Sequence, residues 1–170
     1  MAELSIGQNV FHPTHGTGEI IDITQMDVLE EFQNYYVIKF MGKRLTTHIP
    51  VRNVENTGVR KVISKARVKH VMETLRQLPG KLPKHFKARK KKVEEMINSG
   101  RPTRIAEAVR ELTWRSENDR LNKIDTRLLS QGREMLIKEI AVVIDSDADE
   151  AQKRIDKALA KAVEAKTTQV

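Results

Sequence analysis

The sequence contains no cysteine, which excludes disulfide bonds, thiolate metal sites and a cysteine nucleophile. It also lacks the basic stretch followed by an apolar stretch that marks a secretory signal at an N-terminus. Its densest apolar run, residues 140–144, is far shorter than the roughly 20 residues that a membrane-spanning helix needs. We therefore expect a cytoplasmic protein without membrane contact, and the sequence indicates no metal ion or cofactor.

Acidic residues are scarce in one part of the chain. Residues 56–92 contain 13 basic side chains and one acidic side chain, Glu73, whereas residues 1–55 carry a net charge of −3. With 13 basic side chains and one acidic side chain, residues 56–92 have a net charge of +12, which exceeds the +8 of the whole chain. A solvated lysine-rich face is the alternative, but such faces usually mix both signs. The pattern favours a polyanionic partner such as a nucleic acid.

Residues 5–55 favour short β-strands, because β-branched and aromatic residues alternate with polar ones between turn signals. The expected strands cover residues 9–11, 19–24, 35–40, 44–49 and 51–54. Five short strands in so few residues predict a small SH3-like or Tudor-like β barrel over residues 1–58.

From Ser64 onward the apolar residues recur with the period of a helix, and proline and glycine interrupt the pattern at residues 78–84 and 99–102. The expected helices begin near Ser64 and then cover residues 85–98, 103–118, 125–144 and 151–165. This pattern predicts an all-α five-helix bundle over residues 62–165, followed by a frayed C-terminus at residues 166–170. The fold class is therefore α+β with two domains, and we expect a monomer.

Catalysis has no positive signal in this sequence, and we expect no enzyme. His12-x-x-His15 could suggest a metal hydrolase, but no nearby residue completes the three or four ligands of a zinc site. The pair lies in a turn rich in proline and glycine, where histidine is common. Bound zinc, or an activity that is lost on chelation, would favour the metal hydrolase.

The strongest functional signal is the segment Lys81-Leu-Pro-Lys-His-Phe-Lys-Ala-Arg-Lys-Lys-Lys92. Seven of its twelve residues are lysine or arginine, and they surround one aromatic residue, Phe86, near the expected start of a helix. Side chains of this kind bind phosphates without reading sequence. An apolar residue among them is typical of proteins that insert a wedge between base steps in the minor groove. Phe86 also lies seven residues before Val93, so spacing alone allows it to be a core residue instead.

Several motifs in collinear order resemble the CarD family, whose N-terminal module also occurs in the bacterial transcription-repair coupling factor. In the first domain they are Ile6-Gly-x-x-Val10-x-x-Pro13-x-x-Gly16-x-Gly18, Tyr36-x-Ile38, Leu45-x-x-x-Ile49-Pro50 and Gly58-Val-Arg60. In the second they are Leu82-Pro-Lys84, Lys90–Lys92, Ser99-Gly100, Ile105-Ala106 and the helix Gln131–Ile144. The resemblance covers nearly the whole chain, which has none of the coupling factor's helicase motifs.

The resemblance implies a transcription regulator that docks on the RNA polymerase β subunit through an edge strand of its barrel. The positions that match are Met26, Arg44, Leu45, Thr46, Thr47 and His48. It also implies that the helical domain binds promoter DNA at the upstream edge of the transcription bubble and stabilises the open complex with an aromatic wedge. The DNA-binding positions that match are Lys84, His85, Phe86, Lys87, Arg89, Lys90 and Lys91, with phenylalanine where family members carry tryptophan.

Two other classes remain open at this point. A sequence-neutral architectural DNA-binding protein would have the same basic segment but no polymerase partner. An RNA- or ribosome-associated factor would use the barrel itself, since such barrels also serve there. Copurification with RNA polymerase distinguishes both of them from the regulator.

Overall fold

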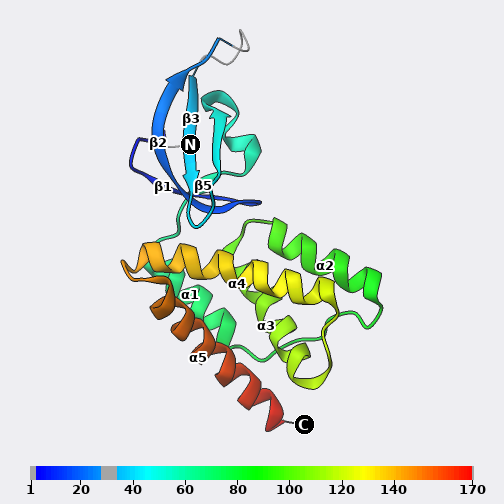
Figure 1. Cartoon of the computed structure of the whole chain (residues 1–170). Helices are drawn as coiled ribbons and strands as arrows, with labels where there is room; N and C mark the ends of the chain where they lie inside the picture. Colours follow the sequence, from blue (N-terminus) through cyan, green and yellow to red (C-terminus); the bar gives the residue numbers. More distant parts are fainter. Residues whose placement is uncertain (1–2, 28–33, 170) are drawn as a thin grey trace. The chain divides into compact units, whose positions relative to one another are not determined.

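The computed structural model of the chain describes residues 3–27 and 34–169, and it divides into two compact units, residues 1–62 and 63–170 (Figure 1). We call them the sheet unit and the helical unit. The division lies next to the change of hydrophobic period in the sequence.

The sheet unit is built on one antiparallel sheet with the strand order β4-β3-β2-β1-β5. Its strands are β1 (Asn9–His12), β2 (Gly16–Gln25), β3 (Asn34–Phe40), β4 (Thr46–Pro50) and β5 (Arg60–Lys61). Within the described residues β4 and β5 form the two edges, so the sheet is open. The five-stranded α+β prediction is confirmed, whereas the closure that defines a barrel is not seen.

The expected strand at residues 51–54 is wrong. This stretch forms 3-10 turns, η1 (Val51–Asn53) and η2 (Glu55–Thr57), and the chain leaves η2 through Gly58 at φ 74°. The β-branched residues Val51 and Val54 pack their side chains against the sheet's core from these turns. The fifth strand is β5, which pairs with Val10 and Phe11, so the sheet continues beyond the expected end at residue 58.

One apolar cluster fills the sheet unit and holds the strands in register. Gly18 allows β2 and β3 to approach closely, because a Cβ at this position would lie 2.9 Å from both the Ile38 Cγ2 and the Lys39 carbonyl oxygen. The cluster consists of Leu4, Val10, Ile20, Tyr36, Ile38, Phe40, Ile49 and Val59.

The helical unit contains five helices, as the sequence predicts. They are α1 (Lys65–Arg76), α2 (Phe86–Asn98), α3 (Pro102–Asn118), α4 (Lys123–Val143) and α5 (Ala148–Thr167). Helix α3 packs against each of the other four, and α5 lies along α1 and α4 (Figure 1). The last helix reaches Thr167, two residues beyond its expected end at residue 165.

Polar residues define where the helices begin. The side chains of Ser64, Asn122 and Asp147 accept backbone amide hydrogen bonds in the first turns of α1, α4 and α5. Helices α2 and α3 begin differently, because His85 and Arg101, which precede them, form no side-chain cap. In the described part of the chain, no helix is long and apolar enough to span a membrane.

Candidate nucleic-acid interface

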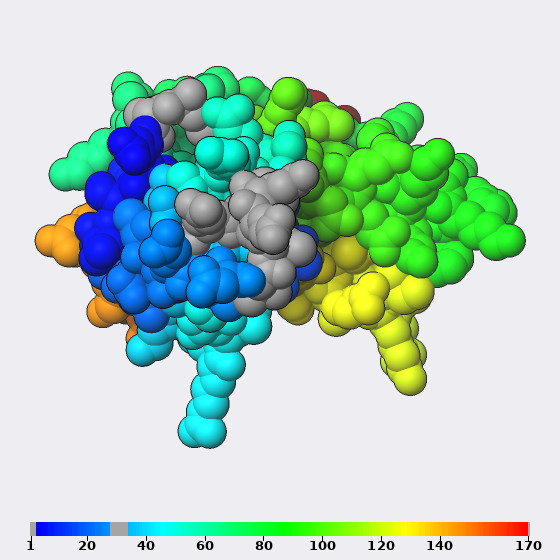
Figure 2. All heavy atoms as spheres, turned by 90° about the horizontal axis from the view of Figure 1, so that it is seen from above, coloured from blue at the N-terminus to red at the C-terminus, as the bar shows by residue number. Residues whose placement is uncertain are grey.

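The start of α2 carries a dense group of exposed cations. Lys84, His85 and Lys87 are exposed around its first turn, and Lys91 and Lys92 are exposed one turn later. Lys90 is partly covered and lies 3.9 Å from the carboxylate of Glu94. We call Lys84, His85, Phe86, Lys87, Lys90, Lys91 and Lys92 the α2 patch. In Figure 2 the green atoms of the segment that contains α2 are seen at the surface, with side chains that reach outward.

The charges in the first turn of α2 do not stabilise the N-terminus of that helix. Its first turn contains no acidic residue, although the partial positive charge of a helix N-terminus favours acids there. The amide groups and the cations at this end both attract anions. The arrangement suits phosphate binding better than it suits helix stability.

Phe86 is 40% exposed, so it is not a fully buried core residue. It is the first residue of α2 and lies on the same helical stripe as Val93, which is completely buried. The buried side chains of α2 begin at Arg89. Phe86 lies almost one turn before it, at the end of the helix, where its ring is only partly covered. An exposed phenylalanine among lysines fits the wedge interpretation.

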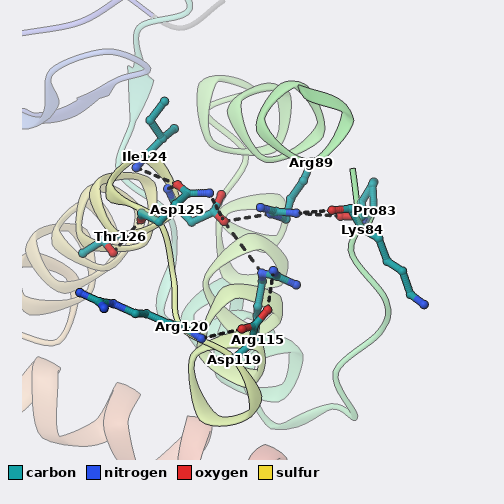
Figure 3. A network of polar contacts seen from close by, with 10 residues as sticks. Pro83, Lys84, Arg89, Arg115, Asp119, Arg120, Ile124, Asp125 and Thr126 are labelled. Atoms are coloured by element: carbon teal, nitrogen blue, oxygen red, sulfur yellow. Dashed lines mark hydrogen bonds and ion pairs between the residues drawn. The ribbon is translucent and has the colours of Figure 1, made fainter. Parts of the chain in front are cut away.

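Arg89 differs from the role expected of it. Its side chain is 4% exposed, its Nε donates to Asp125 Oδ2 at 2.9 Å, and its Nη1 donates to the carbonyl oxygens of Pro83 and Lys84 (Figure 3). A guanidinium held by three acceptors in the interior is not available to a phosphate. Spacing could not reveal this, because the acceptor carboxylate lies 36 residues further along the chain.

Sequence reasoning missed Asp125 as a partner of the basic segment. Its side chain is completely buried at the start of α4, and it follows the capping residue Asn122 by three positions. The Asn-x-x-Asp spacing is a signal of a helix start, but it does not reveal the buried arginine that the carboxylate meets.

The second candidate surface is the edge of β4, which no other strand of the described residues covers. The Leu45 carbonyl accepts the Phe40 amide at 3.0 Å, so Leu45 turns its backbone groups toward β3. Because the direction alternates along a strand, Thr46 and His48 turn their amide and carbonyl groups away from β3. These two residues are exposed, as is Arg44, whereas Leu45 and Thr47 are partly covered. Five of the six expected docking residues thus lie in β4 or directly before it, and three of these five are exposed.

Met26 lies just beyond the end of β2 and is partly covered. It is therefore not part of the β4 edge. Residues 28–33, which follow Met26 and Asp27 in the same loop, lie outside the described residues.

The two histidines of the first turn belong to the structure of that turn. Nδ1 of His12 accepts the amides of Thr14 and His15, and the two imidazole rings stack at 4.6 Å. Burial, with smaller effects from His15 and Lys43, lowers the pKa of His12 from 6.5 to about 4. Burial and Lys43 also lower the pKa of His15. Among the described residues no group of three or more potential ligands could hold a metal ion.

Comparisons with known proteins agree in both units. Residues 4–63 match the family model for the CarD-like/TRCF RID domain, and residues 70–156 match the model for the CarD C-terminal domain. The chain is 31% identical over 138 residues to the "Putative transcription factor YdeB" of Bacillus subtilis (strain 168), across 81% of this chain and 90% of that protein. The chain therefore belongs to the CarD family of transcription regulators.

Proposed function

We propose that this protein docks on the RNA polymerase β subunit through its sheet unit and stabilises the promoter open complex through the α2 patch. No catalytic step is assigned to it. The observation that carries the proposal is the exposed Phe86 ring at the start of a helix, with exposed lysines on either side.

The β4 edge supports the docking step. Two residues of this strand leave their backbone donors and acceptors unpaired by the sheet, which allows a strand of a partner to pair with them. Such pairing depends on backbone groups and needs little side-chain charge, which suits a unit whose first 55 residues are net negative.

The α2 patch supports the DNA step. Its lysines bind phosphates of any sequence, and the Phe86 ring offers an apolar face for a base step that is already opening. A basic patch of this size binds free DNA weakly. Attachment to polymerase raises its effective concentration at the promoter, so the protein itself need not recognise a sequence.

The proposal is tested by adding the full chain to preformed promoter open complexes and following their decay after a polyanion competitor is added. We expect a slower decay, and we expect the chain to copurify with core RNA polymerase. Copurification without any change in decay would contradict the DNA step. Slower decay without copurification would indicate an architectural DNA-binding protein instead.

A further inference from the structure

The interior side of the α2 patch contains a small polar network (Figure 3). We propose that Arg89 and Asp125 form a positioning pair, which fixes the direction in which Phe86 and the Lys84 segment are presented to DNA. The inference rests on the proposed function, and it assigns a role to two residues that cannot themselves contact DNA phosphates.

Asp125 is the fixed half of the pair. It lies in the first turn of α4, where its amide donates to Asn122 Oδ1 at 2.8 Å. Its Oδ2 accepts from Asn122 Nδ2 at 3.0 Å and from Arg89 Nε at 2.9 Å. The negative charge is favourable at a helix N-terminus, and the hydrogen bonds that Oδ2 accepts from Asn122 and Arg89 hold the carboxylate in place.

Arg89 transmits that orientation to the segment before α2. One nitrogen, Nη1, donates to the Pro83 carbonyl at 3.1 Å and to the Lys84 carbonyl at 2.8 Å. The Phe86 ring centroid lies 6.0 Å from the guanidinium carbon of the same side chain. A single buried group therefore contacts the residues on both sides of His85.

The start of α2, which the pair holds in place, has few other polar contacts that could fix it. His85 precedes α2 without a side-chain cap, and Phe86 is too exposed for packing alone to hold its ring. Lysines attract phosphates over several ångströms and tolerate disorder. A wedge has to meet a base step in one orientation, so its function depends on the backbone that carries it.

Three variants of the full chain test the proposal, and two quantities are measured for each: the open-complex lifetime and the salt dependence of DNA affinity. Asp125→Asn keeps the shape of the carboxylate and removes a negative charge, so electrostatic attraction alone predicts tighter binding. Arg89→Lys keeps the positive charge but cannot reach all three acceptors at once. Arg89→Met combined with Asp125→Leu replaces the buried pair with apolar side chains, which usually preserves folding.

We expect all three variants to shorten the open-complex lifetime, by roughly tenfold if most of the stacking on the base step is lost. The dependence of DNA affinity on salt should stay unchanged, because no phosphate contact is removed. Lys87→Ala is the matched comparison, and it should reduce the salt slope by about 0.9. Leu159→Ala in α5, chosen for a similar loss of melting temperature, should leave the lifetime unchanged.

A second measurement needs no DNA. The chain contains four phenylalanines, so 4-fluorophenylalanine labelling gives a simple fluorine NMR spectrum in which Phe86→Tyr identifies the signal of Phe86. We expect Asp125→Asn to narrow that signal and move it toward the free amino acid, with the other signals unchanged. An unchanged Phe86 signal, or a wild-type lifetime in all three variants, would overturn the positioning role. If the unmodified protein fails to bind DNA, the proposed function fails, and the NMR result alone decides whether the pair positions Phe86.

Discussion

The sheet unit and the helical unit present partners with different kinds of contact. In the sheet unit, β4 has outward backbone groups that no other strand of the described residues pairs with, in a part of the chain that is net negative over its first 55 residues. The helical unit offers long cations and one exposed aromatic ring at the start of α2. Backbone pairing depends on strand geometry and little on salt, whereas phosphate binding depends strongly on salt. Substitutions that affect only one unit can therefore separate the two proposed activities.

The largest effect is expected from a substitution that leaves an unpaired charge in the helical unit. Asp125→Ala removes the carboxylate from Arg89, which is 4% exposed, and should lower the unfolding free energy of this unit by about 3–5 kcal/mol. Fluorescence of Trp114, the single tryptophan, reports denaturant unfolding of the helical unit alone. Tyr35 and Tyr36 report on the sheet unit, whose transition should not move. Equal losses in both signals would mean that the two units unfold as one.

The second effect concerns the exposed cations. Changing Lys84, Lys87, Lys90 and Lys91 together to alanine should reduce the salt slope of DNA binding by about four. The loss should be similar for unrelated sequences, because phosphates carry no sequence information. Binding to the β subunit should be retained. A salt slope equal to that of the unmodified protein would place the DNA surface elsewhere.

The third effect is a dependence on pH that belongs to the sheet unit. The folded state favours neutral His12, because its pKa falls from 6.5 to about 4. Between these pH values the unfolded chain binds more protons, so stability is complete above about pH 6.5 and decreases as the pH falls toward 4. Since His12 is partly exposed, we expect a loss of about 1–2 kcal/mol after solvent screening.

His12→Asn is the matched control for this pH dependence. Its side-chain oxygen can accept the same two amides without titrating. The variant should lose this part of the pH dependence when tyrosine signals are followed between pH 7 and 4. An identical pH profile in both proteins would exclude His12 as the source.

The smallest effect is expected at the strand edge. Thr46→Pro removes one outward amide from β4, and a single hydrogen bond contributes about 0.5–1.5 kcal/mol, so affinity for the β subunit should fall roughly threefold to tenfold. Binding to free DNA should not change, because the proposed DNA contact belongs to the helical unit. Unaltered β-subunit affinity, with the sheet unit still folded, would show that the partner does not pair with this edge.

The sequence predicted the helices well because each has a long apolar stripe, and Ser64, Asn122 and Asp147 mark three of their beginnings. The predicted strand at residues 51–54 was wrong, because the β-branched residues at 51 and 54 can pack equally well from a 3-10 turn. Whether the sheet closes depends on pairing between strands distant in sequence, which alternation within a strand does not reveal.

The candidate site shows the same limit. Seven cations in twelve residues correctly indicated a basic surface at the start of a helix, yet one of them, Arg89, lies in the interior. Its burial depends on Asp125, which reaches it only through the packing of α4. The exposure of Phe86 likewise depends on where α2 begins, and the apolar spacing left that open.

The most direct test of the account is the Phe86→Ala variant, measured for both open-complex decay and melting temperature. A ring that stacks on a base step contributes about 1–3 kcal/mol, so the account predicts a lifetime shorter by roughly one to two decades with a nearly unchanged melting temperature. Phe86→Trp should hold the bubble at least as long as the unmodified protein does. A melting temperature lowered by the loss of about 3–5 kcal/mol, with normal protection of the bubble by the folded fraction, would contradict the account and make Phe86 a core residue.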